Sequence, residues 1–466
     1  MSAAEPLASP VVAAIETLRE RFGERLSTSE AVRRHHGTGE AYHPISPPDA
    51  VVWPRDIDEV VAVVRVAAEH RVPIIPYGAG TSLEGHTLAL HGGIAIDLSQ
   101  MNAILRVSAE DLDCTVQAGV TRKQLNAHLR DTGLFFPIDP GADATIGGMS
   151  ATRASGTNAV RYGTMRENVL GLTVVLADGR VVRTGTRARK SAAGYDLTRL
   201  MVGSEGTLGI ICEVTLRLSP QPEAVSAAVC AFPTLGDAVH TVIETIQSAI
   251  PVARMELVCS EGMSALIDHS GLEGYEVADT LFFEFHGTES GVAEQVEAVS
   301  AIAAEHGGSA FRFAARTEDR NALWQARHDA HYAFMARAKP GQRVMATDVC
   351  VPISRLAECV LESKRDLDAS GLWSPVVGHV GDGNFHMGPL ADYTNPEEHA
   401  RAKAWHARMV ERAIRLGGTC TGEHGIGCGK MEFLELEHGE GVEVMRTLKR
   451  ALDPQGIMNP GKVVLV

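Results

Sequence analysis

The sequence predicts an α+β fold made of two domains that meet near residue 220. Two observations support this prediction. A β-α-β pattern over residues 51–98 ends in a glycine-rich loop, and strands with turns continue to about residue 218. From there on, long helices alternate with strands, which is typical of a mainly antiparallel sheet covered by helices. The 466 residues are enough for two or three domains at roughly 100–200 residues per domain.

The first domain is expected over residues 45–220, after a polar helical lead-in at residues 1–44. Short apolar runs predict strands at 51–54, 72–77 and 94–98. Between the first two, apolar residues recur at helical spacing from Ile57 to Ala68, after a start (Asp56 to Glu59) that resembles a capping box. The strand at 72–77 therefore runs directly into the first glycine loop.

The second domain is expected over residues 221–466, with the last stretch, about 430–466, packing back toward the first domain. Helical patterns are predicted at 235–249, 290–306, 317–337, 353–369, 396–416 and 440–452, and strands at 254–259, 280–286, 310–315 and 343–351.

The composition excludes several classes of protein. Forty-three Lys and Arg against 58 Asp and Glu give a net charge of −15, which disfavours a nucleic-acid binder. No apolar run reaches the ~18–20 residues of a membrane span, and no Lys or Arg precedes Arg19, so we expect no signal peptide. Eight Cys without a Cys-x-x-Cys pair fit reduced thiols. We expect a cytoplasmic protein. The alternative is a peripheral location at the inner face of the membrane.

Three loops of small residues suggest one extended ligand. The first, residues 76–82, follows a strand, where free backbone N–H groups can cradle a phosphate. A dinucleotide-binding fingerprint would need a third Gly where Leu83 stands, which disfavours an NAD-linked enzyme. Taken alone, this loop could equally be a structural turn. Similar stretches at 140–156 and 203–210 favour a ligand that lies along the backbone of all three.

A second group of residues has the chemistry of a metal site. His379 and His386 flank an Asp-Gly turn, and Glu423 follows later in a glycine-rich segment. Two imidazoles and a carboxylate are common ligands of first-row divalent ions and leave coordination positions open for a substrate. The alternative is that these histidines are structural, as most of the 19 in the chain must be.

The order of the motifs resembles a known flavoprotein family. The loops are PYGAGTS (76–82), PGADATIGG (140–148), ASGTNAVRYGT (154–164) and LMVGSEGTLGII (200–211). They are similar to the flavin domain of the vanillyl-alcohol oxidase / p-cresol methylhydroxylase superfamily. With TDVCVPISRL (347–356), GHVGDGNFH (378–386), CTGEHGIG (420–427) and MNPGK (458–462), the chain resembles the FAD-linked D-2-hydroxyacid dehydrogenases, and among them the cytochrome-type D-lactate dehydrogenases.

This resemblance implies the cofactors and their contacts. The FAD is expected to be non-covalent, because the first loop has no His before His86. By motif matching, the implied FAD contacts are Pro76, Gly78, Ala79, Gly80, Thr81, Ser82, Gly147, Ser155, Gly156, Tyr162, Gly163, Glu205, Gly206, Ile210, Ile211 and Asn459. The divalent ion, zinc or manganese, would be held by His379, His386 and Glu423.

The resemblance also implies the reaction, oxidation of a D-2-hydroxy acid with hydride transfer to flavin. His424 would act as the base, and Arg327, in the family's L-W-x-x-R segment, would bind the substrate carboxylate. Without the motif, Arg327 would be taken for a solvated helix residue.

The substrate expected is a monocarboxylate, most simply D-lactate. In the D-2-hydroxyglutarate branch a Lys and an Asn stand where this chain has Ala346 and Gly388, so a second carboxylate would be unpaired. A glycolate oxidase flavin subunit and a D-2-hydroxyglutarate dehydrogenase remain the alternatives. The electron acceptor (cytochrome, quinone or electron-transfer flavoprotein) and the oligomeric state, a homodimer included, are left open by the sequence.

Overall fold

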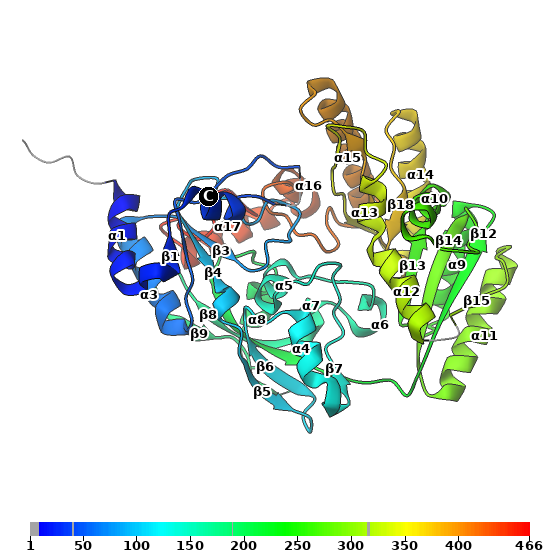
Figure 1. The fold of residues 1–466 in the computed structure, drawn as a ribbon, viewed down its shortest axis with the longest axis horizontal. Coiled ribbons are helices and arrows are strands. Elements are labelled where there is room, and N and C mark those ends of the chain that lie inside the picture. The colour runs from blue at the N-terminus through cyan, green and yellow to red at the C-terminus, as the bar shows by residue number, and fades with distance from the viewer. Residues whose placement is uncertain (1–8, 40–41, 189, 315–316) are drawn as a thin grey trace, which may run out of the picture.

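The computed structural model describes residues 9–39, 42–188, 190–314 and 317–466, which form two lobes side by side (Figure 1). The N-terminal half makes the first lobe, and a large antiparallel sheet with its helices makes the second. The predicted α+β fold class with two domains is confirmed.

The first lobe contains a small sheet of order β1-β2-β4-β3, in which β2 and β3 run parallel to β4. Its strands are β1 (Leu26–Ser27), β2 (Ala50–Val52), β3 (Ile74–Tyr77) and β4 (Ile94–Asp97). Helix α3 (Ile57–His70) connects β2 to β3, and Asp56 caps it by accepting a hydrogen bond from the Glu59 amide at 2.8 Å. Helix α1 (Pro10–Phe22) packs on α3, so part of the stretch 1–44 joins the core of this sheet.

A second sheet of the first lobe is wholly antiparallel, in the order β5-β6-β10-β8-β9. Its strands are β5 (Ile104–Ser108), β6 (Asp113–Gln117), β8 (Val169–Val175), β9 (Val181–Arg183) and β10 (Ile210–Arg217). Short helices lie between these strands: α4 (Arg122–Leu129), α5 (Ile146–Thr152), α6 (Ala159–Tyr162), α7 (Met165–Asn168) and α8 (Leu197–Met201). A further pair joins β7 (Leu134–Phe135) to β11 (Ser219–Pro220).

The second lobe is built on a seven-stranded sheet in which every pairing is antiparallel. Its strands, in order across the sheet, are β15 (Arg312–Phe313), β12 (Ala224–Phe232), β14 (Asp279–Gly287), β13 (Arg254–Val258), β18 (Val376–Gly378), β19 (Asn384–Met387) and β17 (Val349–Cys350). The helices are α9 (Leu235–Gln247), α10 (Ser260–Ser270), α11 (Glu289–Glu305), α12 (Thr317–His328), α13 (Ala330–Met335), α14 (Leu356–Ala369) and α15 (Pro396–Arg415).

The structure differs from the sequence-based elements in this lobe at several places. The helix predicted at 317–337 is two helices, α12 and α13, with Asp329 at the start of the second. The strand predicted at 343–351 is interrupted and forms β16 (Arg343–Val344), which pairs with β20 (Leu390–Ala391), and β17. The residues between β16 and β17 enter the site described below. Strand β12 and helix α10 were not predicted.

The C-terminal segment returns to the first lobe, as Figure 1 shows in red. Helices α16 (Leu434–His438) and α17 (Gly441–Leu452) precede a parallel bridge between Met458 and Ile74. Lys449, buried on α17, donates to the carbonyl of Thr207 at 2.8 Å. The last residues of the chain therefore help to hold β3, the strand that ends in the first glycine loop.

Candidate active site

A β-hairpin in the second lobe brings His379 and His386 together. Strands β18 and β19 pair with Val377 opposite His386, and the turn between them ends at Gly383, whose φ of 79° is rarely adopted by other residues. The two imidazole centroids lie 5.7 Å apart. The hairpin thus holds both rings at one end of the sheet.

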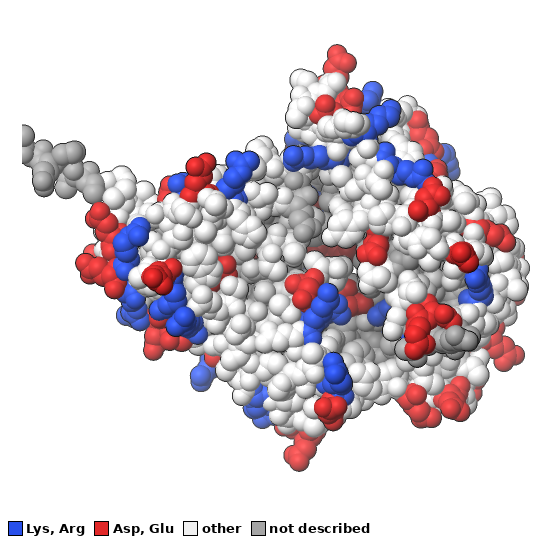
Figure 2. Space-filling view, viewed as in Figure 1, with Lys and Arg blue, Asp and Glu red and all other residues white. Residues whose placement is uncertain are grey.

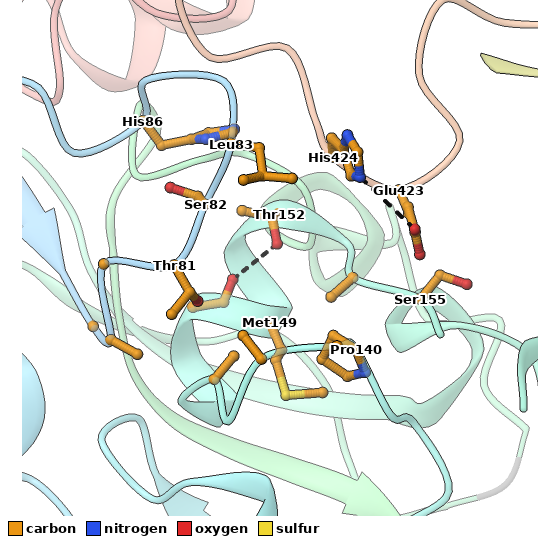
Figure 3. A pocket seen from close by; sticks show the side chains of 18 of the residues that line it. Thr81, Ser82, Leu83, His86, Pro140, Met149, Thr152, Ser155, Glu423 and His424 are labelled. Atoms are coloured by element: carbon orange, nitrogen blue, oxygen red, sulfur yellow. Dashed lines mark hydrogen bonds and ion pairs between the residues drawn. The ribbon is translucent and has the colours of Figure 1, made fainter. Parts of the chain in front are cut away.

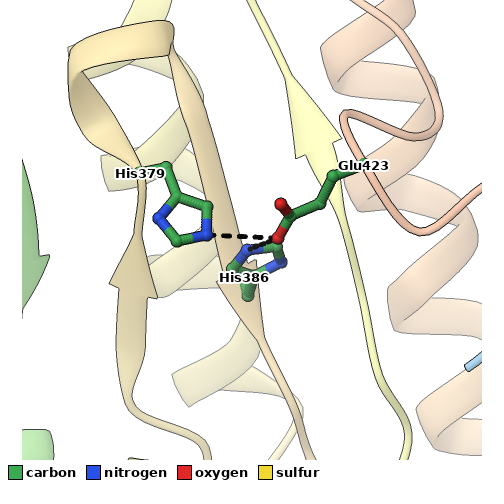
Figure 4. A group of neighbouring side chains, drawn as sticks. All are labelled: His379, His386 and Glu423. Atoms are coloured by element: carbon green, nitrogen blue, oxygen red, sulfur yellow. Dashed lines mark ion pairs between the residues drawn. The ribbon is translucent and has the colours of Figure 1, made fainter. Parts of the chain in front are cut away.

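Glu423 approaches the same point from a separate loop (Figure 4). Its Oε1 lies 3.2 Å from Nε2 of His379 and 3.3 Å from Nε2 of His386. Two ligands about 2.1 Å from one ion at a tetrahedral angle are about 3.4 Å apart, which is close to both distances. The three ligand atoms lie within 4.8 Å of one another, so these residues fit a divalent ion.

The other nitrogen of each ring is already engaged. His379 Nδ1 lies 2.7 Å from Glu256 Oε1, and His386 Nδ1 lies 2.8 Å from the carbonyl of Thr347. Because both partners are acceptors, each Nδ1 carries a proton, and Nε2 is the ring atom that remains to bind an ion. This is the arrangement that metal-binding histidines require.

Asp348 fixes the loop that carries Glu423 and His424. The aspartate is fully buried, and its Oδ2 accepts the backbone N–H of Glu423 at 2.8 Å and of His424 at 2.9 Å. Thr421 donates to the same oxygen at 2.7 Å, and Asn384 donates to Oδ1 at 2.6 Å. Burial alone would raise the pKa of Asp348, but nearby positive charge, including Lys430, holds it below its ordinary value.

His424 lies beside the cluster and is neutral. Its ring is stacked on His386 with centroids 5.0 Å apart, and its Nε2 is 3.8 Å from Glu423 Oε1. Burial lowers the pKa of His424 to about 4, so the imidazole is unprotonated at neutral pH. A neutral imidazole next to a metal cluster can accept a proton.

Arg327, on α12, is buried rather than solvated, with 7% of its surface exposed. Its Nη2 donates to Glu256 Oε2 at 2.6 Å, while its Nε is buried and has no partner in the described part of the chain. The guanidinium therefore keeps donors available for a second anion. It is also the sole Lys or Arg among the described residues that line the cavity.

One cavity of about 440 Å³ connects this cluster to the glycine loops of the first lobe. His379, His386, Glu423, His424 and Arg327 all line it. Figure 3 shows Glu423 and His424 on one side of the cavity, facing first-lobe residues such as Leu83 and Ser155. Its size is in the range of about 300–1,000 Å³ seen for small-molecule sites.

Comparisons with known proteins show the family. A model described as an FAD-binding domain matches residues 48–185, and a model of the C-terminal domain of FAD-linked oxidases matches residues 221–463. A probable mitochondrial D-lactate dehydrogenase of Danio rerio is 49% identical, covering 98% of this chain and 93% of that protein. A mitochondrial cytochrome D-lactate dehydrogenase of Arabidopsis thaliana is 48% identical, over 97% of this chain and 80% of that one.

The chain belongs to the FAD-linked oxidase family. It is an FAD-dependent oxidoreductase, and the resemblance inferred from the motifs is confirmed. The structure of p-cresol methylhydroxylase superposes on this FAD-linked oxidase with a TM-score of 0.81 over 98% of this chain and 97% of that one, at 18% identity. That likeness concerns the fold alone, and it confirms the two-domain arrangement predicted for the superfamily.

The first lobe of the FAD-linked oxidase offers walls that fit a flavin dinucleotide. The loop after β3 lies at the carboxyl end of a parallel strand, the end at which open α/β sheets bind their ligands. Gly80 has a φ of 72°, and a Cβ on Gly78 would collide with Thr145 Oγ1. Ser82 Oγ is buried and has no hydrogen-bond partner among the described residues. An unpaired hydroxyl in a glycine loop is well suited to bind a phosphate.

Most of the predicted FAD contacts line the cavity. Those on its wall are Pro76, Gly78, Ala79, Gly80, Thr81, Ser82, Gly147, Ser155, Glu205, Gly206, Ile211 and Asn459. Their positions agree with the motif assignment, while their individual roles in binding FAD stay predictions.

The structure does not place the other four on the wall: Gly156, Tyr162, Gly163 and Ile210. A Cβ on Gly156 would meet the backbone of Asp139, so this glycine serves close packing within the first lobe. The Tyr162 hydroxyl lies 2.7 Å from His286 Nδ1 in the second lobe and so helps to join the lobes. Ile210 is buried within β10. These contacts give Gly156, Tyr162 and Ile210 a structural place, and the FAD contact expected of all four residues stays a prediction.

The carboxylate of Glu205 is directed at another loop of the protein. It accepts the backbone N–H of Ile426 and of Gly427, both at 2.7 Å, and lies 3.0 Å from His86 Nε2. Because residues 426 and 427 directly follow the Glu423–His424 loop, Glu205 ties that loop to the first lobe. Glu205 also lines the cavity, and its contact with FAD stays a prediction.

Sequence reasoning missed Glu256 and assigned no role to Asp348. An acidic residue inside the apolar strand Arg254–Val258 was a usable signal, because a charge buried in a sheet needs partners. Asp348 stands in a motif but far along the chain from the residues it holds, so its contacts could not be inferred from spacing.

No helix in the described residues of the FAD-linked oxidase is long and apolar enough to cross a membrane. Both relatives named above are described as mitochondrial. The cytoplasmic location expected from the sequence stays a prediction. On the face seen in Figure 2, acidic and basic side chains are interspersed. The homodimer considered from the sequence also stays a prediction.

Proposed function

We propose that this protein oxidises a D-2-hydroxy acid, most simply D-lactate to pyruvate, with FAD and a divalent ion. The observation that supports the proposal most strongly is that a metal-type cluster, a neutral histidine and one guanidinium line the same cavity as the glycine loops. A 2-hydroxy acid presents a matching set of groups: a hydroxyl, a carboxylate and a hydrogen on C2. The D-lactate dehydrogenase names of the close relatives favour the same substrate.

Each residue of the site has one role in the proposed reaction. Arg327 binds the substrate carboxylate, and this contact orients C2 toward the first lobe. His424 takes the hydroxyl proton at Nε2, the ring atom on the side of the cluster. When bound at His379, His386 and Glu423, a divalent ion would lower the pKa of the hydroxyl, and FAD would supply the acceptor for the C2 hydride. The products are the 2-oxo acid, one proton and a two-electron-reduced cofactor.

The cavity wall favours a small monocarboxylate. Arg327 is the sole fixed cation among the described lining residues. Ala346 and Gly388 are on the wall, as are the apolar residues Val344 and Phe334. A second carboxylate there would be desolvated without a partner, which costs several kcal/mol. We therefore propose D-lactate rather than a dicarboxylic hydroxy acid. For the acceptor we propose a cytochrome, as the name of the Arabidopsis thaliana relative specifies.

The proposal predicts a stereospecific, metal-dependent activity. The purified holoenzyme should reduce an artificial dye with D-lactate, slowly or not at all with L-lactate, glycolate and D-2-hydroxyglutarate, and it should lose turnover after chelation and dialysis. Turnover should return on adding Zn²⁺ or Mn²⁺ but not Mg²⁺, because imidazole ligands favour the transition metals. A preference for L-lactate, or full activity in protein shown to be metal-free, would contradict the proposal.

A further inference from the structure

Glu256 is a buried acid for which the reaction just proposed has no role. It is fully buried on β13, the central strand of the seven-stranded sheet, and it does not line the cavity. A carboxylate at such a position is strongly disfavoured unless charged groups or donors pair with it. Its partners therefore indicate what it does.

The pairing of the strands places Glu256 beside the metal hairpin. Strand β13 pairs antiparallel with β18, and Leu257 stands opposite Gly378. The next position along each strand is Glu256 on one side and His379 on the other. On the same side, α12 approaches β13, and the Arg254 guanidinium lies over the Trp324 ring, 4.7 Å from its centroid. Arg327 follows Trp324 by about one helical turn, so it also faces Glu256.

Each carboxylate oxygen of Glu256 has its own partner. Oε1 accepts from His379 Nδ1 at 2.7 Å, and Oε2 accepts from Arg327 Nη2 at 2.6 Å. The Arg327 guanidinium is a permanent cation, so the buried carboxylate that accepts its hydrogen bond is an anion. One anion thus connects a residue of the metal cluster to the residue proposed to bind the substrate carboxylate.

We propose that Glu256 is a positioning residue that holds the metal cluster and the carboxylate-binding arginine in one fixed geometry. A 2-hydroxy acid carries its hydroxyl and its carboxylate on adjacent carbons, so the two binding groups must keep a constant separation. Glu256 sets that separation through a single side chain on the most central strand of the sheet. The inference rests on the proposed function, in which these two groups bind the two ends of one substrate.

Glutamine at this position is the sharpest substitution. A carboxylate accepts hydrogen bonds at both oxygens, whereas an amide has one acceptor and one NH₂ donor. In Glu256→Gln the NH₂ must face either His379 Nδ1–H or the Arg327 guanidinium, and both of these are donors. The volume is unchanged, so the variant removes the shared anion with little effect on packing.

The experiment uses purified holoprotein stripped of metal. Mn²⁺ binding is measured by calorimetry, and pyruvate binding is measured in the metal-free state from the change it causes in the flavin absorbance spectrum. Glu256→Gln should weaken Mn²⁺ binding about 10- to 100-fold, as the loss of the partner of a metal-binding histidine does, and weaken pyruvate binding by about tenfold. Neither readout requires turnover.

Glu284→Gln is the matched control. Glu284 is also a buried glutamate of this sheet, in register with Arg254 and 2.8 Å from His286 Nε2, but it contacts neither His379 nor Arg327. It should leave both affinities within about twofold of wild type. If Glu256→Gln does not retain FAD, Glu256→Asp is used in its place. The shorter side chain cannot reach both His379 and Arg327, so this variant should weaken the binding of Mn²⁺, of pyruvate, or of both.

The outcomes separate the inference from the proposed function. A loss of about fivefold or more in either affinity for the Glu256 variant, with Glu284→Gln unaffected, supports the positioning role. Smaller changes in both affinities, or equal losses in Glu284→Gln, would overturn it. A wild-type enzyme that binds Mn²⁺ but fails to oxidise D-2-hydroxy acids would refute the proposed function alone.

Discussion

In the His424→Ala variant, D-lactate should reduce the flavin about 10²- to 10⁴-fold more slowly than in the wild-type holoenzyme, with FAD still bound. The magnitude is that of losing a general base. Nε2 of His424 lies next to the metal-type cluster, and burial keeps the imidazole neutral, with a pKa of about 4. Because the expected FAD walls come mainly from the first lobe, removing this second-lobe ring should not release the cofactor.

The measurement is anaerobic stopped-flow at the flavin absorbance band, with D-lactate as reductant. His406→Ala is the control, since His406 on α15 is also buried, with its ring against Phe433, and it does not line the cavity. The control should retain most of the wild-type rate. A His424→Ala enzyme that reduces its flavin as fast as wild type would show that another group takes the proton.

The Glu423→Gln variant should lose at least about 100-fold in Zn²⁺ or Mn²⁺ affinity and should turn over D-lactate only at metal concentrations raised in proportion. Removing a direct ligand should exceed the 10- to 100-fold effect of removing the partner of a ligand. Glu423 Oε1 faces the Nε2 atoms of His379 and His386, and the amide would replace the one anion that faces both of them. The loop itself should persist, because Asp348 holds its backbone N–H groups.

Metal content after dialysis, followed by titration of Mn²⁺ into the stripped protein, gives the measurement. Glu437→Gln is the control: its side chain is 15% exposed against 14% for Glu423, and it accepts the Cys420 N–H at the start of the same loop. That variant should keep its metal. Wild-type metal affinity in Glu423→Gln would exclude this carboxylate as a ligand.

The local parts of the fold could be predicted from the sequence, and the sheet pairings could not. Apolar spacing and the Asp56 cap define α3 and the strands on either side of it. Strand β12 was not predicted from the sequence because four of its nine residues are alanine, which has a weak preference for strands. The break between β16 and β17 is caused by the site itself, since Thr347 and Asp348 turn inward to contact His386 and the Glu423 loop.

The same distinction applies to the site. Glycine loops and the two histidines are visible because they form short motifs whose chemistry is local. Glu205, Glu256 and Asp348 act on residues between 36 and 222 positions away, and only the folded chain brings such pairs together. Motif matching predicted Glu205 beside the cofactor, and the structure shows in addition that its carboxylate holds the loop that carries His424. Residues that support a site by holding other residues leave little trace in local sequence patterns.

We expect one ion to lie between the hairpin and the Glu423 loop, in the same cavity as the flavin. Anomalous diffraction at the zinc edge, on crystals of the active holoenzyme grown with zinc, tests it most directly. We predict one strong peak about 2.0–2.2 Å from Nε2 of His379, Nε2 of His386 and a carboxylate oxygen of Glu423, with the flavin ring in the same cavity. A peak at other residues, or no peak in crystals of zinc-dependent enzyme, would contradict the account.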